Sequence, residues 1–327
     1  MREITPQLNE KLKAHFKDSV AKADAYPMAT YTDLVRIIAE LSYLNRNKCL
    51  LFRGQGRDFR NKAGASTLYP SLYRRTAIAK PSLEHDFSVL KELSSILIEE
   101  IRKVDRRSAE EVKKRLCIPW AILQHYQVYE TPLLDLTQSI RAACSFALDE
   151  VGKIYGETQN SPLKGGDEFA FVYVLGLPYM NSGISIDSQE EIISLRLLSA
   201  CPSLALRPYF QDAFLAGTVD ITDNYDDKNE LDFNRRLIAK FAIPNDDAFW
   251  NGSVHKIPNE LLFLDKDNDL MYKICSYIHL AVMQAKELLF ESGENTKEVN
   301  ELTTILRKRL IFRGVGSQST VRRITTD

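Results

Sequence analysis

The sequence is short of the residues that interrupt regular structure, with 14 glycines and 12 prolines among 327 residues, and it has no long polar segment of low complexity. These shortages exclude a collagen-like or largely disordered chain. Hydrophobic residues make up 44% of the sequence and charged residues 27%, which is enough apolar material for one large core or two smaller ones. The composition therefore predicts a globular protein, with disorder expected only at its ends.

Cysteine is also scarce, with five scattered residues and no CxxC pair. Thiols spread through apolar sequence are typical of reduced cysteines in a core and not of a disulfide framework. Of the five histidines, His279 alone lies within five residues of another histidine or a cysteine, at four residues from Cys275, and one such pair does not supply the four ligands of a zinc site. We therefore expect neither a disulfide scaffold nor a metal site.

Long hydrophobic runs free of charge are absent. The most apolar stretch, residues 270–290, is interrupted by Lys273, Lys286 and Glu287, whose burial in a bilayer would cost too much. The first twenty residues are charged and lack the apolar region of a secretory signal. We therefore expect a cytoplasmic protein that does not enter a membrane.

An excess of one charge is missing too, because 43 basic residues face 44 acidic ones and leave a net charge of −1. This balance predicts no strong general attraction to nucleic acid. Locally, residues 53–75 contain six basic side chains and one acidic one, whereas residues 220–232 are strongly acidic. The basic segment is either a solvated face or a site for an anion.

Hydrophobic spacing predicts an α+β fold with a small mixed or antiparallel sheet surrounded by helices, and a helical C-terminal third. We expect an N-terminal helical extension over residues 1–29, a central domain over 30–285 and a C-terminal helix with a basic tail over 286–327. The expected helices cover residues 32–45, 82–104, 140–148, 231–241, 270–290 and 296–310. The expected strands cover residues 49–52 and 169–175, with weaker signals at 192–195 and 204–206.

Arg53 is expected at the end of the first strand, where Gly54 and Gln55 begin a tight loop. A guanidinium placed there can hold a phosphate or carboxylate through two parallel hydrogen bonds. Alternatively, Arg53 forms a buried ion pair that fixes the loop. Downstream, Tyr73 and Arg74 bring a second arginine beside an aromatic ring and could wall the same site.

Three consecutive hydrogen-bonding side chains follow at Gln124, His125 and Tyr126. Only a loop or an irregular helix end could aim them at one ligand, because consecutive helical residues point about 100° apart. With an unperturbed pKa near neutrality, His125 could act as an acid or base or bind a ribose hydroxyl. The alternative is a structural histidine with its hydrogen bonds satisfied.

Asp135 and Thr137 are expected just before a helix that begins near Gln138. Both are good N-cap residues, so a capping role explains them without a ligand. A helix N-terminus also attracts anions, and the two roles are compatible.

Taken in order, these segments resemble the FRG domain, a family named for its Phe/Tyr-Arg-Gly motif and found mainly in bacteria and their phages. The sequence departs from the family pattern at Gln127, Leu136 and Ala213, which replace a glycine, a tryptophan and a glycine. The resemblance is carried by residues 52–55, 68–74, 124–126, 131–137, 142–147 and, as a late strand, Arg207 with residues 211–214.

A looser similarity to ADP-ribosyltransferases implies that NAD is a substrate and that Gln211 stands where those enzymes have a glutamate. The resemblance implies that Arg53 holds phosphate, His125 a ribose hydroxyl, and Thr137 the nicotinamide side. The candidate catalytic residues are His125 and Gln211. The candidate ligand-binding residues are Arg53, Gly54, Gln55, Tyr73, Arg74, Gln124, Tyr126, Asp135, Thr137 and Arg207.

Three functions remain open. One is a non-catalytic module that binds an anionic, nucleotide-like ligand and contacts a partner protein through its helices. Another is an NAD-dependent ADP-ribosyltransferase that modifies a macromolecule, as a toxin or a phage-defence effector. The last is a hydrolase or nuclease, for which Asp135 has no evident carboxylate companion.

Overall fold

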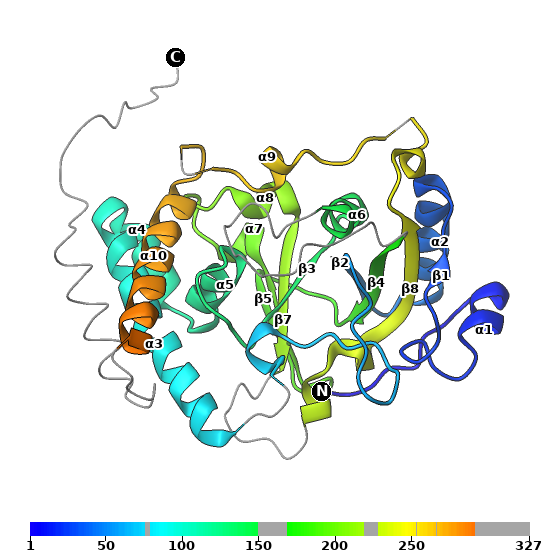
Figure 1. The fold of residues 1–327 in the computed structure, drawn as a ribbon, viewed down its shortest axis with the longest axis horizontal. Coiled ribbons are helices and arrows are strands. Elements are labelled where there is room, and N and C mark those ends of the chain that lie inside the picture. Colours follow the sequence, from blue (N-terminus) through cyan, green and yellow to red (C-terminus); the bar gives the residue numbers. More distant parts are fainter. Residues whose placement is uncertain (76–78, 150–168, 219–227, 253, 266, 292–327) are drawn as a thin grey trace.

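The computed structural model describes residues 1–75, 79–149, 169–218, 228–252, 254–265 and 267–291. Its strands are β1 (Tyr26–Pro27), β2 (Cys49–Gln55), β3 (Leu134–Thr137), β4 (Phe169–Leu177), β5 (Ile184–Asp187), β6 (Ile192–Arg196), β7 (Ala213–Thr218) and β8 (Leu237–Pro244). They form one eight-stranded sheet in the order β1-β8-β4-β2-β3-β7-β6-β5 (Figure 1). β1 and β8 are parallel, and the other neighbouring strands are antiparallel.

The helices gather at both ends of this sheet. α1 and α2 lie beside β1 and β8, whereas α3, α4 and α10 lie at the opposite end, and α6 packs on β2 (Figure 1). The helices are α1 (Glu10–Phe16), α2 (Tyr31–Leu44), α3 (Lys80–Val104), α4 (Arg106–Lys113), α5 (Cys117–His125), α6 (Ile140–Leu148), α7 (Leu197–Ala200), α8 (Arg207–Gln211), α9 (Asn259–Leu262) and α10 (Leu270–Glu291). Short 3-10 turns are η1 (Ser71–Tyr73), η3 (Lys228–Leu231), η4 (Phe233–Arg236) and η5 (Asp247–Trp250).

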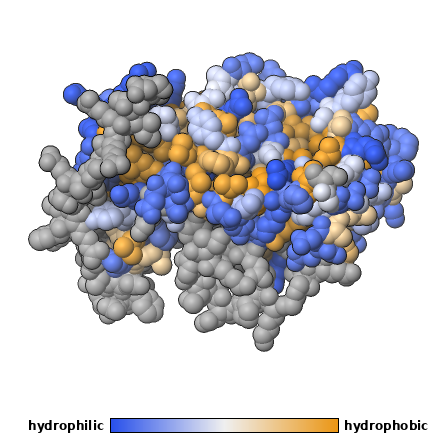
Figure 2. All heavy atoms as spheres, turned by 90° about the horizontal axis from the view of Figure 1, so that it is seen from above, coloured by the Kyte–Doolittle hydropathy of each residue, from blue (hydrophilic) through white to orange (hydrophobic). Residues whose placement is uncertain are grey.

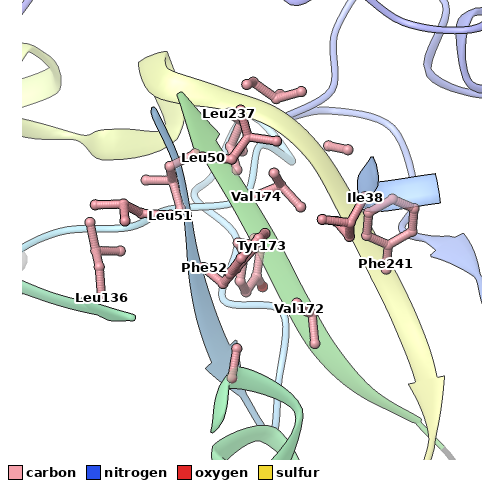
Figure 3. Close-up of a cluster of buried hydrophobic side chains, with 14 of the residues drawn as sticks. Ile38, Leu50, Leu51, Phe52, Leu136, Val172, Tyr173, Val174, Leu237 and Phe241 are labelled. Atoms are coloured by element: carbon pink, nitrogen blue, oxygen red, sulfur yellow. The ribbon is translucent and has the colours of Figure 1, made fainter. Parts of the chain in front are cut away.

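Two large hydrophobic clusters form the core. The first joins β2, β4 and β8 to α2, and Figure 3 shows side chains of the three strands, among them Phe52, Val174 and Phe241, gathered in it. The second joins α3, α5 and α10 to β6 and β7. α2 packs on the first cluster through the apolar face of its amphipathic helix, on which Leu34 and Leu41 are fully buried. Thr30 caps the N-terminus of this helix.

Seen from above, the molecule has a band of hydrophobic residues between hydrophilic margins (Figure 2). α8 and α9 lie at the upper side of the molecule in Figure 1. Their residues Phe210 and Leu261 are each 43% exposed. None of the helices in the described ranges is long and apolar enough to cross a membrane.

The sheet is weakly joined at its middle. β2 pairs with β4 along its whole length, and β3 pairs with β7 along its whole length, but β2 and β3 share the single registered pair Phe52 and Thr137. Beyond that pair the two strands part, at the ends that carry Arg53 and Asp135. This divergence positions the polar residues described below.

The α+β prediction is confirmed, as are the helices expected at residues 82–104 and 270–290 and the strands at 49–52, 169–175 and 192–195. The helix predicted over residues 231–241 is wrong. η4 and then β8 occupy that segment. β8 is a nearly continuous apolar run because it lies between β4 and the short edge strand β1 and is buried on both faces.

Other expectations for single elements need correction. Residues 204–206 form no strand, and Arg207–Gln211, expected in a late strand, are helical, with Asp212 in a left-handed conformation that turns the chain into β7. Asp135 and Thr137 lie inside β3 instead of capping a helix, because Ser139 is the N-cap of α6. The helix expected at 296–310 and the basic tail lie outside the described residues.

Candidate functional site

The Phe52-Arg53-Gly54 segment sends neighbouring side chains to opposite faces of the sheet. Phe52 is 5% exposed and belongs to the first hydrophobic cluster. A Cβ atom on Gly54 would lie 1.9 Å from the main-chain oxygen of Ala143 and 2.8 Å from the main-chain nitrogen of Ala147. Glycine is therefore required for α6 to approach β2 this closely, and the intervening Arg53 points away from that contact.

Arg53 bridges the two strands where they part. Its Nη1 donates a hydrogen bond of 2.7 Å to the main-chain oxygen of Asp135. This is its single hydrogen bond to the part of the chain that the structure describes, and its buried Nε has no partner there. The side-chain oxygen of Gln55, the next residue on the same face of β2, is also buried without a partner among those residues.

Gln124 is held between two hydroxyl groups and a carboxylate. Its Oε1 accepts hydrogen bonds of 2.8 Å from the hydroxyls of Ser71 and Thr131, and its Nε2 donates one of 2.7 Å to Oδ2 of Asp135. The opposite amide orientation would turn an oxygen toward the carboxylate, so this network fixes the orientation of the amide.

His125 contacts the other carboxylate oxygen of Asp135, with Nδ1 3.5 Å from Oδ1. Burial lowers the pKa of His125, although the Asp135 carboxylate acts in the opposite direction, so the imidazole is uncharged at neutral pH. The carboxylate favours the tautomer of the imidazole that carries its proton on Nδ1, and Nε2 is then a hydrogen-bond acceptor. Nε2 is buried and has no partner in the described ranges.

Asp135 stays ionised in these surroundings. Burial by itself would raise the pKa of its carboxyl group, but hydrogen bonds from His125 and Gln124, together with the charge of Arg53, lower the pKa below its ordinary value. Its side chain remains 35% exposed, compared with 4% for the side chain of His125.

Arg74 adds a second positive charge near Arg53. Burial lowers the pKa of Arg53 to about 10, and the charge of Arg74 contributes in the same direction, while Asp135 opposes it. Burial also lowers the pKa of Arg74, against the charges of Asp135 and Glu130. The Nε of Arg74 donates to the main-chain oxygen of Tyr69 over 3.2 Å, its single hydrogen bond to the described residues. Both arginines are charged at neutral pH.

Several predicted site residues lie away from this cluster or are enclosed. Tyr73 is 1% exposed and packs with Leu72 and Leu83. The hydroxyl of Thr137 donates to the main-chain oxygen of Gln211 over 2.6 Å. The side chain of Gln211 donates to the main-chain oxygen of Leu262 over 2.6 Å and is buried.

Tyr126 and Arg207 belong to a separate buried cluster. The guanidinium carbon of Arg207 lies 4.8 Å from the ring centres of both Tyr126 and Tyr272. The hydroxyl of Tyr126 and the main-chain nitrogen of Arg207 both donate to Asp269, over 2.7 and 2.9 Å. These contacts join α5, α8 and α10.

Ser71 and Thr131, which hold Gln124, lie in segments that carry the family resemblance but were not among the predicted site residues. Nor did the sequence predict a buried network around Lys240, whose Nζ donates to the hydroxyl of Ser66 over 2.6 Å and lies 3.4 Å from Asp58. The hydroxyl of Tyr173 donates to Asp58 over 2.9 Å. In the sequence, this network is indicated only by Lys240, a single lysine inside the apolar run 237–244.

No group of three or more histidine, cysteine, aspartate or glutamate side chains in the described ranges is placed to hold a metal ion. Two surface hollows, of about 410 and 620 Å³, lie away from the polar cluster, between the start of α10 and residues 203–206 and beside β1 and residues 57–60. The candidate site is therefore the polar cluster of Arg53, Gln124, His125 and Asp135, where β2 and β3 diverge.

Residues 48–154 match the family model of the FRG domain. The matched range begins one residue before β2 and contains Arg53, Arg74, Gln124, His125 and Asp135. This segment of the chain is therefore identified as an FRG domain. No curated protein and no solved structure matches the chain.

Proposed function

We propose that the site where β2 and β3 diverge binds an anionic, nucleotide-like ligand, and that Arg53 and Arg74 hold its phosphate. One observation carries this proposal. Two neighbouring guanidinium groups each use a single hydrogen bond within the described part of the chain, so most of their donors are uncommitted. A planar guanidinium presents these donors in the geometry that a phosphate accepts.

The electrostatics of the pair also support an anion. Burial and the neighbouring Arg74 lower the pKa of Arg53 to about 10, which means that both destabilise its positive charge. Asp135 supplies one negative charge nearby, but this charge acts on both arginines. Both guanidinium groups donate to main-chain oxygens of the described residues and not to the Asp135 carboxylate. A phosphate between them would offset the remaining repulsion.

The test is calorimetric titration of the full chain with inorganic pyrophosphate, ATP and NAD. Arg53→Lys retains the charge but loses the planar fork, so we expect binding to weaken about tenfold or more, since one charge-assisted hydrogen bond contributes about 1.5–3 kcal/mol. Arg53→Ala should weaken it further. The matched control is Arg36→Lys on the exposed face of α2, which should bind like the wild type.

Stability separates the binding role from a structural one. Arg53→Ala leaves the main-chain oxygen of Asp135 without its donor, a loss of about 1–3 kcal/mol, and no buried carboxylate loses a direct partner. A larger loss of the unfolding free energy, together with a wild-type protein that binds none of the three compounds, would make Arg53 a structural residue and contradict the proposal.

The alternative activity is transfer of ADP-ribose from NAD to a macromolecule by a toxin or phage-defence effector. It has less support, because the carboxamide of Gln211 is buried against Leu262 and cannot supply the charge of a carboxylate. Incubation with NAD labelled in its adenosine moiety tests it, since label on protein or nucleic acid would establish transfer. A hydrolase or nuclease has no specific observation in its favour.

A further inference from the structure

Asp135 is held at three atoms and still reaches solvent. Gln124 donates to Oδ2 over 2.7 Å, Nδ1 of His125 lies 3.5 Å from Oδ1, and Arg53 donates to the main-chain oxygen over 2.7 Å. The Asp135 side chain keeps 35% of its surface accessible, whereas the His125 side chain keeps 4%. Of this pair, Asp135 is the group that an incoming molecule can touch.

The residues behind Asp135 are themselves fixed. Ser71 and Thr131 hold the carboxamide oxygen of Gln124, so the amide cannot turn away from the carboxylate without losing both hydroxyl partners. A carboxylate oxygen accepts about two hydrogen bonds, and the described residues occupy only part of that capacity. The carboxylate is therefore ordered before any ligand arrives, which lowers the entropic cost of binding.

The charge of this carboxylate sets the chemistry that it can recognise. The pKa of Asp135 lies below its ordinary range, so the group accepts hydrogen bonds and does not donate them at neutral pH. The neighbouring His125 is uncharged and does not neutralise it. A ligand made only of anionic groups would be repelled by Asp135, whereas one that pairs an anion with hydroxyl donors fits both Asp135 and the arginines.

We propose that Asp135 accepts hydrogen bonds from the hydroxyl groups of a phosphorylated sugar, as in the ribose of a nucleotide, while His125 and Gln124 act as positioning residues behind it. This inference rests on the proposed phosphate site at Arg53 and Arg74. It assigns the hydroxyl contact to Asp135 and not to His125, because the imidazole is enclosed.

The experiment compares ATP with 2′,3′-dideoxy-ATP and inorganic pyrophosphate in calorimetric titrations of the full chain. The wild type should bind ATP at least tenfold more tightly than the dideoxy compound, because the analogue offers no hydroxyl donor to the fixed carboxylate. In Asp135→Asn the ratio should fall to within about twofold. Arg53→Lys should weaken both nucleotides by a similar factor and leave the ratio unchanged, and Asp18→Asn, an exposed control, should change neither.

The positioning role of His125 is tested with the same ratio. His125→Gln keeps an amide that can donate to Asp135, whereas His125→Phe has no donor. The glutamine variant should keep part of the preference for ATP and the phenylalanine variant should lose it, with both measured below their melting temperatures. Equal ratios in the two variants would overturn the role assigned to His125.

The outcomes distinguish the two proposals. If pyrophosphate binds and ATP binds no more tightly than dideoxy-ATP, the hydroxyl contact is overturned and the phosphate site stands. If Asp135→Asn keeps the wild-type ratio, the hydroxyls are recognised elsewhere and the inference is again overturned. If the wild type binds none of the three compounds, the phosphate site fails, and with it the inference that depends on it.

Discussion

Each residue of Phe52-Arg53-Gly54 has a different physical role. Phe52 fills the hydrophobic cluster, Arg53 spans the gap between β2 and β3, and Gly54 leaves room for the main chain of α6. The alternation of side chains along a strand makes this division possible within three positions. A motif that suggests a ligand loop in the sequence therefore combines two packing requirements with one polar residue, whose buried Nε has no partner among the described residues.

Gly54→Ala should destabilise the protein strongly. The new methyl group would overlap main-chain atoms of α6, at 1.9 Å from the oxygen of Ala143, and main-chain atoms cannot move aside as the end of a flexible side chain can. Overpacking typically costs about 1–3 kcal/mol, and this contact should exceed that range. The measurement is the free energy of unfolding in urea.

Gly56→Ala is the matched control, because its methyl group would lie 3.8 Å from the nearest atom, the main-chain oxygen of Ala147. We expect its unfolding free energy to stay within about 0.5 kcal/mol of the wild type. Similar losses in the two variants would show that the approach of α6 to β2 is not what requires glycine at position 54.

At the level of elements, α6 begins at a different cap from the one its sequence suggests. The hydroxyl of Ser139 accepts a hydrogen bond of 3.1 Å from the main-chain nitrogen of Ala142. Ser139→Ala should therefore lower the unfolding free energy by about 1 kcal/mol. Gln138→Ala, one residue earlier and exposed, should change it by less than about 0.5 kcal/mol. A greater loss in the Gln138 variant would contradict this assignment of the cap.

The sequence predicts an element correctly when one of its faces is buried, because its apolar residues then recur with a clear period. β2 and β4 are buried on both faces over much of their length, and they are recognised instead by the glycines that bound them and, in β4, by aromatic and β-branched residues. α3 and α10 follow the rule of one buried face. β8 does not, because both of its faces are buried and its apolar run has no period that separates strand from helix. Asp135 and Thr137 were misplaced for another reason, since residues that suit a cap also tolerate a short strand.

Only part of the candidate site could be predicted from the sequence. The pairing of Arg53 with the main chain of Asp135, 82 positions away, depends on the divergence of β2 and β3, which no local pattern encodes. The exposure of Asp135 relative to His125 depends equally on how α5 packs. The sequence indicated which residue types lie near the motif. The contacts among these residues, and their exposure to solvent, follow from the arrangement of the sheet.

Across the whole molecule, Asp232 connects η4 to the segment that leads to η1 and Arg74. Its Oδ1 accepts hydrogen bonds from the main-chain nitrogens of Leu68 and Asn234, over 2.8 and 2.9 Å. Burial raises the pKa of this carboxyl group to about 6, against the lowering effect of those bonds. The ionised carboxylate therefore carries a cost at neutral pH, although it accepts hydrogen bonds from two main-chain nitrogens.

This raised pKa predicts how stability changes with pH. The folded state holds the proton more tightly than the unfolded state, so the contribution of Asp232 is fully present below about pH 4 and is lost as the pH rises through about 6. The difference between this pKa and that of an unperturbed aspartate corresponds to roughly 3 kcal/mol of stability. Asp232→Asn keeps an oxygen for both main-chain donors and has no charge to bury. Its unfolding free energy, measured in urea from pH 4 to 8, should exceed that of the wild type at pH 8, and the difference should diminish as the pH falls toward 4. A difference between the two proteins that does not change with pH would mean that Asp232 does not titrate in this range.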